Sequence, residues 1–280
     1  MAEADALLTI WPWQAGALDP QGPIAAAERT ILLNATAIML AVVVPVIVLT
    51  LAFAWWFRAG NSAARYLPDW EYSGRIEVVV WSIPTLVILF LGGIAWIGSH
   101  DLDPPVAIAS DVPPINIEVV SLDWKWLFIY PDQHVASVNR LVVPAGAPLS
   151  FRLTSASVMN SFFVPQLGSQ IYTMSGMTTR LNLQADRPGI YPGMSAQFSG
   201  DGFSDMRFNV EALPKEGFED WLKTTRSAGG KLDAPTYAEL ARPSSAVAPA
   251  TFGDVAPQLF ETLTMPGSHG AASAAPQEGK

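Results

Sequence analysis

Few side chains in this chain have the types and the spacing that catalysis or metal binding requires. The sequence of 280 residues contains no cysteine and three histidines. His100, His134 and His269 form neither an i, i+4 pair nor a cluster with carboxylates, which argues against a mononuclear metal site. The lack of cysteine excludes disulfides, zinc fingers, thiol catalysis and iron–sulfur clusters. No Ser-His-Asp set, carboxylate pair or glycine-rich phosphate loop is found, so we expect no independent catalytic chemistry in this chain.

One stretch has the spacing of a metal-binding loop although it lacks the ligands. This stretch is YPGMSAQFSGDGFSDM, from Tyr191 to Met206. Its frame resembles the copper-binding loop Gly-x-Cys-x-x-x-Cys-x-x-x-His-x-x-Met in subunit II of haem-copper oxidases, with Gly193 and Met206 retained. An upstream motif, SVMNSFFVPQLGSQ, resembles the segment that gives this family a further histidine ligand. Where the family has its other copper ligands, this chain has Asn160, Ser195, Ser199 and Phe203. Gln197 stands where the family has a glutamate between its two cysteines.

The residues at these positions cannot form the copper centre of that family. Copper in electron transfer is held by sulfur and nitrogen ligands, whereas serine, asparagine and phenylalanine supply neither thiolate nor imidazole. Met206 is the one ligand type retained. Its place in the alternating segment MRFNVEA, on the same face as Phe208 and Val210, favours a core methionine. A retained loop with exchanged ligands resembles the quinol-oxidising branch of the family, and the chain is therefore identified as resembling subunit II of bo-type ubiquinol oxidases.

The resemblance extends over about residues 18–260 and implies a role in respiration. It implies a subunit of a proton-translocating membrane complex that oxidises ubiquinol and reduces oxygen to water. In such a complex this chain would be non-catalytic, would bind no cofactor and would serve structure and assembly. The haems, the remaining copper and most of the quinol site would belong to partner subunit I, and subunits III and IV are further expected partners. The net charge of −9 argues against nucleic acid as a partner.

Two other interpretations are left open by the residues alone. One is a subunit II of a cytochrome c oxidase that has lost its copper but keeps a docking role. The other is a non-redox, membrane-anchored, cupredoxin-like binding protein that acts outside any oxidase. Co-purification with a large haem-bearing subunit would argue against the second.

Two charge-free apolar runs predict a transmembrane hairpin over residues 30–99. Helices at about 30–57 and 78–98 are each long enough, at ~1.5 Å per residue, to cross a hydrocarbon core of ~30 Å. The connecting loop contains Arg58, Arg65 and Arg75, so the positive-inside bias places it in the cytoplasm. The N-terminal segment 1–29 and the chain after the hairpin are then periplasmic, at the inner membrane of a bacterium. Segment 1–29 has no basic residue before Arg29 and thus lacks the cationic start of a signal peptide.

Glu77 opens the second predicted helix, in the stretch SGRIEVVVW. This stretch resembles the family's frame for a glutamate at the mouth of a proton pathway into subunit I, so Glu77 is a proton-pathway candidate. The alternative interpretation is structural, because an acid in the first turn of a helix is stabilised by the helix dipole and, here, by Arg75.

The remainder of the chain predicts a β domain that carries the loop. After a Pro-rich linker, 100–113, segments such as INIEVVS and RLNLQA alternate apolar and polar residues and predict an antiparallel sandwich or barrel. The resemblance makes this a cupredoxin-like Greek-key domain over 114–213. Within LDWKWLFIY, Trp124 and Trp126 resemble the family's aromatic strand near the electron entry point. Their spacing places both on one face of a strand, where packing in the core or against subunit I is the simpler interpretation.

The C-terminal part consists of two regions, of which only the first has a helical pattern. Residues 214–265 are rich in aromatic residues at helical spacing and resemble the segment that follows the cupredoxin domain in quinol oxidases. Residues 266–280 are small and polar, which predicts a disordered tail. The expected fold class is thus a membrane protein with a two-helix transmembrane hairpin, an all-β cupredoxin-like Greek-key domain and a short helical C-terminal segment.

Overall fold

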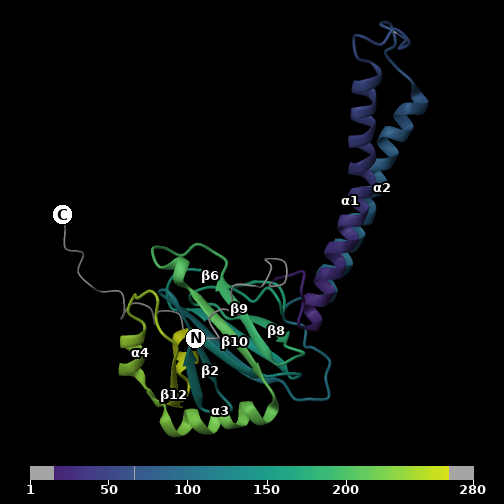
Figure 1. Ribbon diagram of the computed structural model, residues 1–280. Helices are drawn as coiled ribbons and strands as arrows, with labels where there is room; N and C mark the ends of the chain where they lie inside the picture. Colours follow the sequence, from purple (N-terminus) through teal and green to yellow (C-terminus); the bar gives the residue numbers. More distant parts are fainter. Residues whose placement is uncertain (1–15, 66, 265–280) are drawn as a thin grey trace, which may run out of the picture. The chain divides into compact units, whose positions relative to one another are not determined.

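The structure, a computed structural model, describes residues 16–65 and 67–264 (Figure 1). The chain forms two compact units, one spanning Arg29–Leu102 and the other joining the segment that ends at Glu28 to the chain from Asp103 onward. The predicted tail, 266–280, lies outside the described residues, as does the first part of the predicted segment 1–29. The predicted fold class is confirmed, with two apolar helices, a two-sheet β domain and short C-terminal helices.

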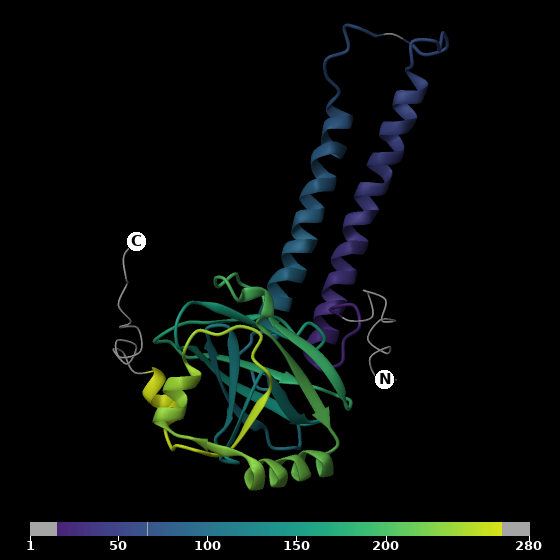
Figure 2. The ribbon, with the colours of Figure 1, turned by 60° about the vertical axis from the view of Figure 1, so that its left-hand side comes forward.

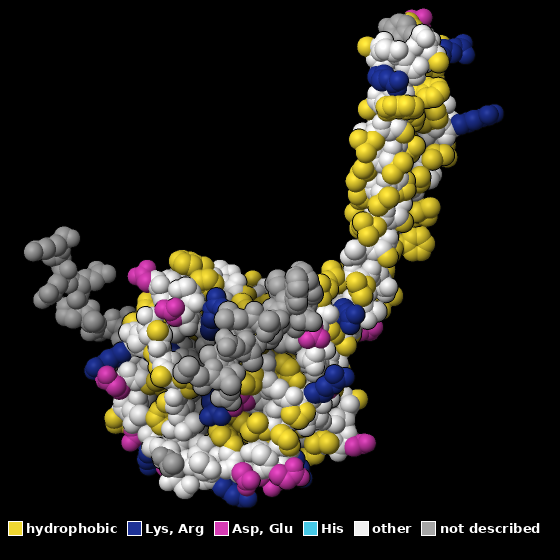
Figure 3. All heavy atoms as spheres, in the orientation of Figure 1, with side chains coloured by type: hydrophobic (Ala, Val, Ile, Leu, Met, Phe, Trp, Pro, Cys, Tyr) yellow, Lys and Arg dark blue, Asp and Glu magenta, His cyan; other side chains and the backbone are white. Residues whose placement is uncertain are grey.

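Two long helices, α1 (Pro23–Trp56) and α2 (Gly74–Asp101), account for most of the unit Arg29–Leu102. Both are long and apolar enough to cross a membrane, and hydrophobic side chains cover much of their visible surface (Figure 3). They begin before residues 30 and 78. The prediction counted only charge-free residues, whereas α1 includes Glu28 and Arg29 and α2 includes Arg75 and Glu77. Thr36, Thr50 and Thr85 donate their hydroxyls to carbonyls four residues earlier, which satisfies these polar groups inside the apolar segments.

The β domain consists of a seven-stranded and a five-stranded sheet, with strand orders β11-β12-β3-β2-β1-β5-β8 and β4-β10-β9-β6-β7. Three pairs run parallel, namely β1 with β5, β4 with β10 and β11 with β12. The sheets are therefore mixed, whereas the sequence predicted an antiparallel arrangement. Alternation of polarity predicts strands and their faces but not the direction of the neighbouring strands. The strands are β1 (Ile115–Leu122), β2 (Lys125–Tyr130), β3 (Val135–Val138), β4 (Arg140–Pro144), β5 (Pro148–Ser155), β6 (Asn160–Phe163), β7 (Ile171–Thr173), β8 (Thr179–Gln184), β9 (Gly189–Ser195), β10 (Arg207–Leu213), β11 (Gly230–Leu232) and β12 (Ala250–Val255).

Strand β2 separates two hydrophobic cores and is buried at every position. Trp126 and Phe128 face the core between the sheets, where they pack against Phe162 and Phe208 with ring centroids 5.2–6.4 Å apart. Leu127 and its neighbour Ile129 face the opposite side and form a second core with residues of the C-terminal segment. Both faces of this strand are thus withdrawn from water, which explains its nearly continuous run of large side chains.

The C-terminal segment covers one end and one side of the β domain in both views (Figures 1 and 2). It contains α3 (Lys215–Ala228), α4 (Ala234–Leu240) and α5 (Leu259–Thr264). The helical spacing places Phe218, Trp221 and Leu222 on α3, against the core between the sheets. The segment also adds β11 and β12 to the larger sheet. We did not predict these two strands, because β11 is only three residues long and β12, ATFGDV, does not alternate clearly.

Candidate functional site

The loop that resembles a copper site joins β9 to β10 and contains a short 3-10 helix, η2 (Phe203–Asp205). The fold brings Ser195, the last residue of β9, to Asn160 at the start of β6, and the Ser195 hydroxyl donates to Asn160 Oδ1 at 3.1 Å. The loop closes on itself, because Ser195 N donates to the carbonyl of Met206 at 3.0 Å. Within it, the Ser199 hydroxyl lies 4.0 Å from Met206 Sδ. Four of the predicted positions therefore converge at one end of the five-stranded sheet.

Two of the predicted positions take a different part in the loop. The backbone carbonyl of Gln197 accepts from the Ser195 hydroxyl at 3.3 Å, while its side chain is half-buried. The Phe203 ring packs edge-on against Phe198, with centroids 5.6 Å apart, and Phe198 is 72% exposed. The loop thus presents an aromatic pair to its surroundings at the position where the family has an imidazole.

Trp124 holds the loop from the other sheet. It lies in the turn between β1 and β2, outside the regular strand, and its indole Nε1 donates to the carbonyl of Ser199 at 3.0 Å. Gly200 and Gly202 lie flat on the indole, since a Cβ atom at Gly202 would come within 2.6 Å of the ring and Gly200 has a φ of 111°. Larger residues would lift the loop from the tryptophan. By contrast, Trp126 is fully buried in the core between the sheets.

A network of hydrogen-bonded, buried hydroxyl and amide groups around Asn160 supports the loop. The hydroxyls of Ser121 and Thr173 lie 2.8 Å apart, and Thr173 also donates to the carbonyl of Asn160 at 3.4 Å. The side-chain amide of Asn160 donates to the carbonyl of Val158 at 3.3 Å. Asn160, Ser121 and Thr173 are all at most 1% exposed. Because a buried polar group without a partner is costly, this network fixes the position of Asn160 and, through it, of Ser195.

The donor set does not fit a copper centre. Asn160 and Ser195 are neutral and bound to each other, and Met206 offers a single buried thioether. A copper electron-transfer site needs thiolate and imidazole donors. Among residues 16–65 and 67–264, no three His, Asp or Glu side chains are grouped so that they could hold a metal ion. What the arrangement can do is hold the loop in one shape by neutral hydrogen bonds.

Lys125 is a structural residue of this region that we did not predict. It is 1% exposed, and its ammonium group donates to the carbonyls of Asp123 and Arg242 at 3.2 and 2.8 Å and to the Ser244 hydroxyl. Burial lowers the pKa of Lys125, and the Asp123 carboxylate opposes this shift. The Trp124 amide donates to the carbonyl of Ser244 at 3.3 Å. The turn that holds the loop is therefore also tied to the C-terminal segment. In the sequence, the signal for this structural role was the presence of a single lysine among the large apolar residues of the strand.

A second charged side chain fastens the end of the C-terminal segment. Arg152 on β5 pairs with Glu118 at 3.0 Å and with Glu261 of α5 at 2.7 Å, and its guanidinium lies 4.9 Å from the centre of the Phe260 ring. Burial raises the pKa of Glu118, although Arg152 counteracts this effect. The end of the C-terminal segment thus packs on this face of the larger sheet, where Phe260 is 1% exposed and belongs to the second core.

Glu77 belongs to the other unit and lies in the first turn of α2. Its side chain is exposed in the single chain. It lines an open hollow together with Tyr72, Gly74, Trp81 and Ser82. The structure thus gives Glu77 a polar and aromatic surrounding at the start of an apolar helix.

Comparison with known proteins gives matches over nearly the whole chain. Residues 132–213 match the family described as cytochrome c oxidase subunit II, periplasmic domain, and residues 226–265 match the COX aromatic rich motif. Cytochrome bo(3) ubiquinol oxidase subunit 2 of Pseudomonas aeruginosa is 51% identical, over 92% of this chain and 78% of that protein. Ubiquinol oxidase subunit 2 of Acetobacter aceti is 47% identical, over 88% of this chain and 80% of the relative.

A solved structure was also found. The periplasmic domain of cytochrome oxidase subunit II of Bradyrhizobium japonicum is 21% identical, with a TM-score of 0.39, over 42% of this chain and 96% of that one. The identification itself depends on the sequence relatives, which match at about half of the aligned positions and over most of both chains. This chain belongs to the family of subunit 2 of the ubiquinol oxidases.

Proposed function

We propose that this chain is subunit II of a proton-translocating respiratory oxidase that takes electrons from ubiquinol and reduces oxygen to water. The observation that carries this proposal is the hydrogen bond between Ser195 and Asn160. Both residues stand where the family has copper ligands, and here their side chains bind each other. Without thiolate and imidazole donors, the loop offers no entry for electrons from a water-soluble protein. A quinol dissolved in the bilayer can instead deliver electrons directly to a partner subunit.

In this proposal the chain has a structural part in the complex and no reacting group of its own. Subunit I is the proposed holder of the haems and the remaining copper, and subunits III and IV are proposed neighbours. Arg58, Arg65 and Arg75, around the connection between α1 and α2, support a cytoplasmic connection. Both ends of the chain and the β domain are then periplasmic, and the exposed apolar surfaces of α1 and α2 face lipid or subunit I.

Affinity purification of the full chain from detergent-solubilised membranes tests this assignment. We expect a haem-bearing subunit to co-purify in a fixed ratio, with haem absorbance that changes when ubiquinol is added under anaerobic conditions. A chain that is isolated repeatedly without haem would contradict the proposal and favour a binding protein outside any oxidase.

Glu77 is proposed to act at the mouth of a proton pathway. Its exposed position in the first turn of α2, beside Tyr72 and Ser82, supports this role. In the assembled complex, Glu77→Ala should reduce the number of protons released per electron, whereas Glu71→Ala, in the preceding loop, should not. Unchanged turnover and proton release in Glu77→Ala would leave only a structural role for this residue.

A further inference from the structure

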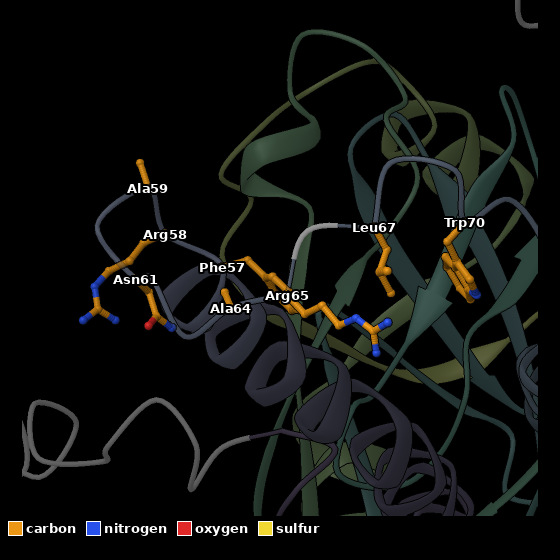
Figure 4. A pocket seen from close by; sticks show the side chains of 8 residues that line it. All are labelled: Phe57, Arg58, Ala59, Asn61, Ala64, Arg65, Leu67 and Trp70. Atoms are coloured by element: carbon orange, nitrogen blue, oxygen red, sulfur yellow. The ribbon is translucent and has the colours of Figure 1, made fainter.

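The connection between α1 and α2 forms an open pocket that the proposed oxidase function does not use. Its volume is about 660 Å³. Its lining side chains extend from the end of α1 along the connection as far as Trp70 (Figure 4). The residues that line it are Phe57, Arg58, Ala59, Asn61, Ala64, Arg65, Leu67 and Trp70.

The lining carries two positive charges and no carboxylate. Arg58 donates one N–H to the carbonyl of Trp55 at 2.8 Å and lies over the Trp55 ring at 4.8 Å, which leaves other N–H groups of its guanidinium for a ligand. Arg65 extends along the loop toward Leu67 and Trp70 (Figure 4). Within the part of the chain that the structure describes, neither arginine pairs with an acidic side chain. The lining of the pocket therefore carries positive charge at both ends that no lining carboxylate neutralises.

Apolar side chains line the pocket between and beside the two arginines (Figure 4), and the loop that forms it is held in shape. Phe57, Leu67 and Trp70 supply the apolar wall. Asn61 is already engaged, because its amide donates to the carbonyl of Trp56 at 2.6 Å and its carbonyl oxygen accepts from the amide of Ala63 at 3.1 Å. Asn61 thus closes the end of α1 and shapes the loop, while the arginines remain available.

The position of the pocket identifies the chemistry of its ligand. Phe57 and Arg58 come directly after Trp56, the last residue of a 34-residue apolar helix. When that helix spans a bilayer, its end lies at the level of the lipid headgroups, where aromatic and basic residues are favoured. Guanidinium groups bind phosphate oxygens in paired hydrogen bonds. Glycerol and the first methylenes of an acyl chain suit the wall of Phe57, Leu67 and Trp70.

We propose that this pocket binds the headgroup of an anionic phospholipid. The phosphodiester lies at the guanidinium of Arg65, the glycerol backbone packs against Trp70 and Leu67, and Arg58 adds positive charge at the other end of the pocket (Figure 4). Two cations in a lining without a carboxylate favour a lipid with a net negative charge over a zwitterionic one, whose own cation would be repelled. This site is independent of the electron donor of the complex.

The test measures lipid binding to the full chain in mild detergent by native mass spectrometry, with phosphatidylglycerol and phosphatidylcholine of equal chain length. We expect the wild-type chain to retain phosphatidylglycerol in preference to phosphatidylcholine. The double variant Arg58→Gln/Arg65→Gln should bind phosphatidylglycerol on the order of tenfold more weakly, since each basic residue near a charged lipid contributes about a fewfold in affinity. The matched control is Arg180→Gln/Arg187→Gln, which removes two exposed arginines from the β domain and should bind as the wild type does.

A conservative variant guards against an effect of misfolding. Arg58→Lys/Arg65→Lys keeps both charges, so it should retain most of the preference for phosphatidylglycerol. Equal binding by the glutamine variant and the wild type would overturn the proposal, as would equal retention of the two lipids by the wild type. Displacement of phosphatidylglycerol by millimolar inorganic phosphate would also overturn it, because the pocket would then be a site for free anions.

Discussion

The copper-type loop and the C-terminal segment are both fastened to the turn at Asp123 and Trp124, but by different chemistry. The loop is held by neutral groups, through the Trp124 indole and the hydroxyl of Ser195. The C-terminal segment is held by charged groups, through the ammonium of Lys125 and, farther along, the guanidinium of Arg152. Neutral hydrogen bonds make the shape of the loop independent of pH, whereas the C-terminal segment responds to the protonation of its partners. A loop without metal ligands can thus be held in place by neutral groups alone.

The largest expected effect comes from returning the ligands to the loop. Because the backbone frame and Met206 are retained, the combined change Asn160→His, Ser195→Cys, Ser199→Cys and Phe203→His should convert a chain without a copper site into one that binds copper stoichiometrically. Copper per chain is measured by elemental analysis after dialysis. The same variant with serine kept at position 199 is the control and should lose most of the copper. If the complete set also fails to bind copper, the loop has not kept a metal-binding shape.

Removal of the charged tie to the C-terminal segment should have the next largest effect. In Lys125→Ala, the carbonyls of Asp123 and Arg242 lose a charged donor, and we expect a loss of about 3 kcal/mol in the free energy of opening of the segment. Hydrogen exchange of the amides in β11 and α4 measures this loss. Lys223→Ala removes an exposed lysine and should change the opening by less than about 0.5 kcal/mol. Similar exchange in the two variants would show that the ammonium of Lys125 does not hold the segment.

The attachment of α5 should be weaker and should depend on pH. Arg152→Met removes two partly exposed ion pairs and the contact with Phe260, and should destabilise α5 by about 1.5 kcal/mol. The raised pKa of Glu118 means that the folded form holds its proton more tightly than the unfolded chain, which titrates near 4.5. The stability that this proton adds is complete below that pH and is lost as the pH rises through the folded pKa.

The pH dependence can be measured separately from the loss of contacts. After correction for intrinsic exchange rates, the amides of α5 should exchange faster as the pH rises from about 4.5 toward neutrality. Glu118→Gln should flatten this dependence, because glutamine does not titrate. A dependence that is unchanged in Glu118→Gln would assign it to another group, such as Glu261 or Asp132, which both face Glu118.

The smallest effect is expected where a neutral bond in the loop is removed. Ser195→Ala leaves Asn160 Oδ1 without the Ser195 hydroxyl, which should cost about 1 kcal/mol in local stability. The cost should be the same between pH 5 and pH 8, since neither group titrates there. Hydrogen exchange of residues 195–206 measures it, with Ser204→Ala, an exposed serine in the same loop, as the control. A cost that varies with pH would contradict the neutral fastening of the loop.

The sequence predicted some levels of this structure better than others. A charge-free run reflects a helix with an apolar surface all round, and period-two alternation reflects a strand with one buried face. The apolar helices and the strands of the β domain could therefore be predicted. The frame from Gly193 to Met206 identified the loop. Alternation could not reveal that a strand is covered on both faces, and for this reason Lys125 and Arg152 were not expected to hold the C-terminal segment. Their partners are distant in sequence, and no local pattern specifies such contacts.

Oxygen consumption by the purified complex tests the central claim most directly. Ubiquinol and reduced cytochrome c are compared as electron donors at equal concentrations. A loop closed by Asn160 and Ser195 offers no electron entry from the aqueous side, so turnover should occur with ubiquinol and should be absent with cytochrome c. Turnover with cytochrome c at a comparable rate would mean that electrons enter through another centre, and would contradict the function assigned to this chain.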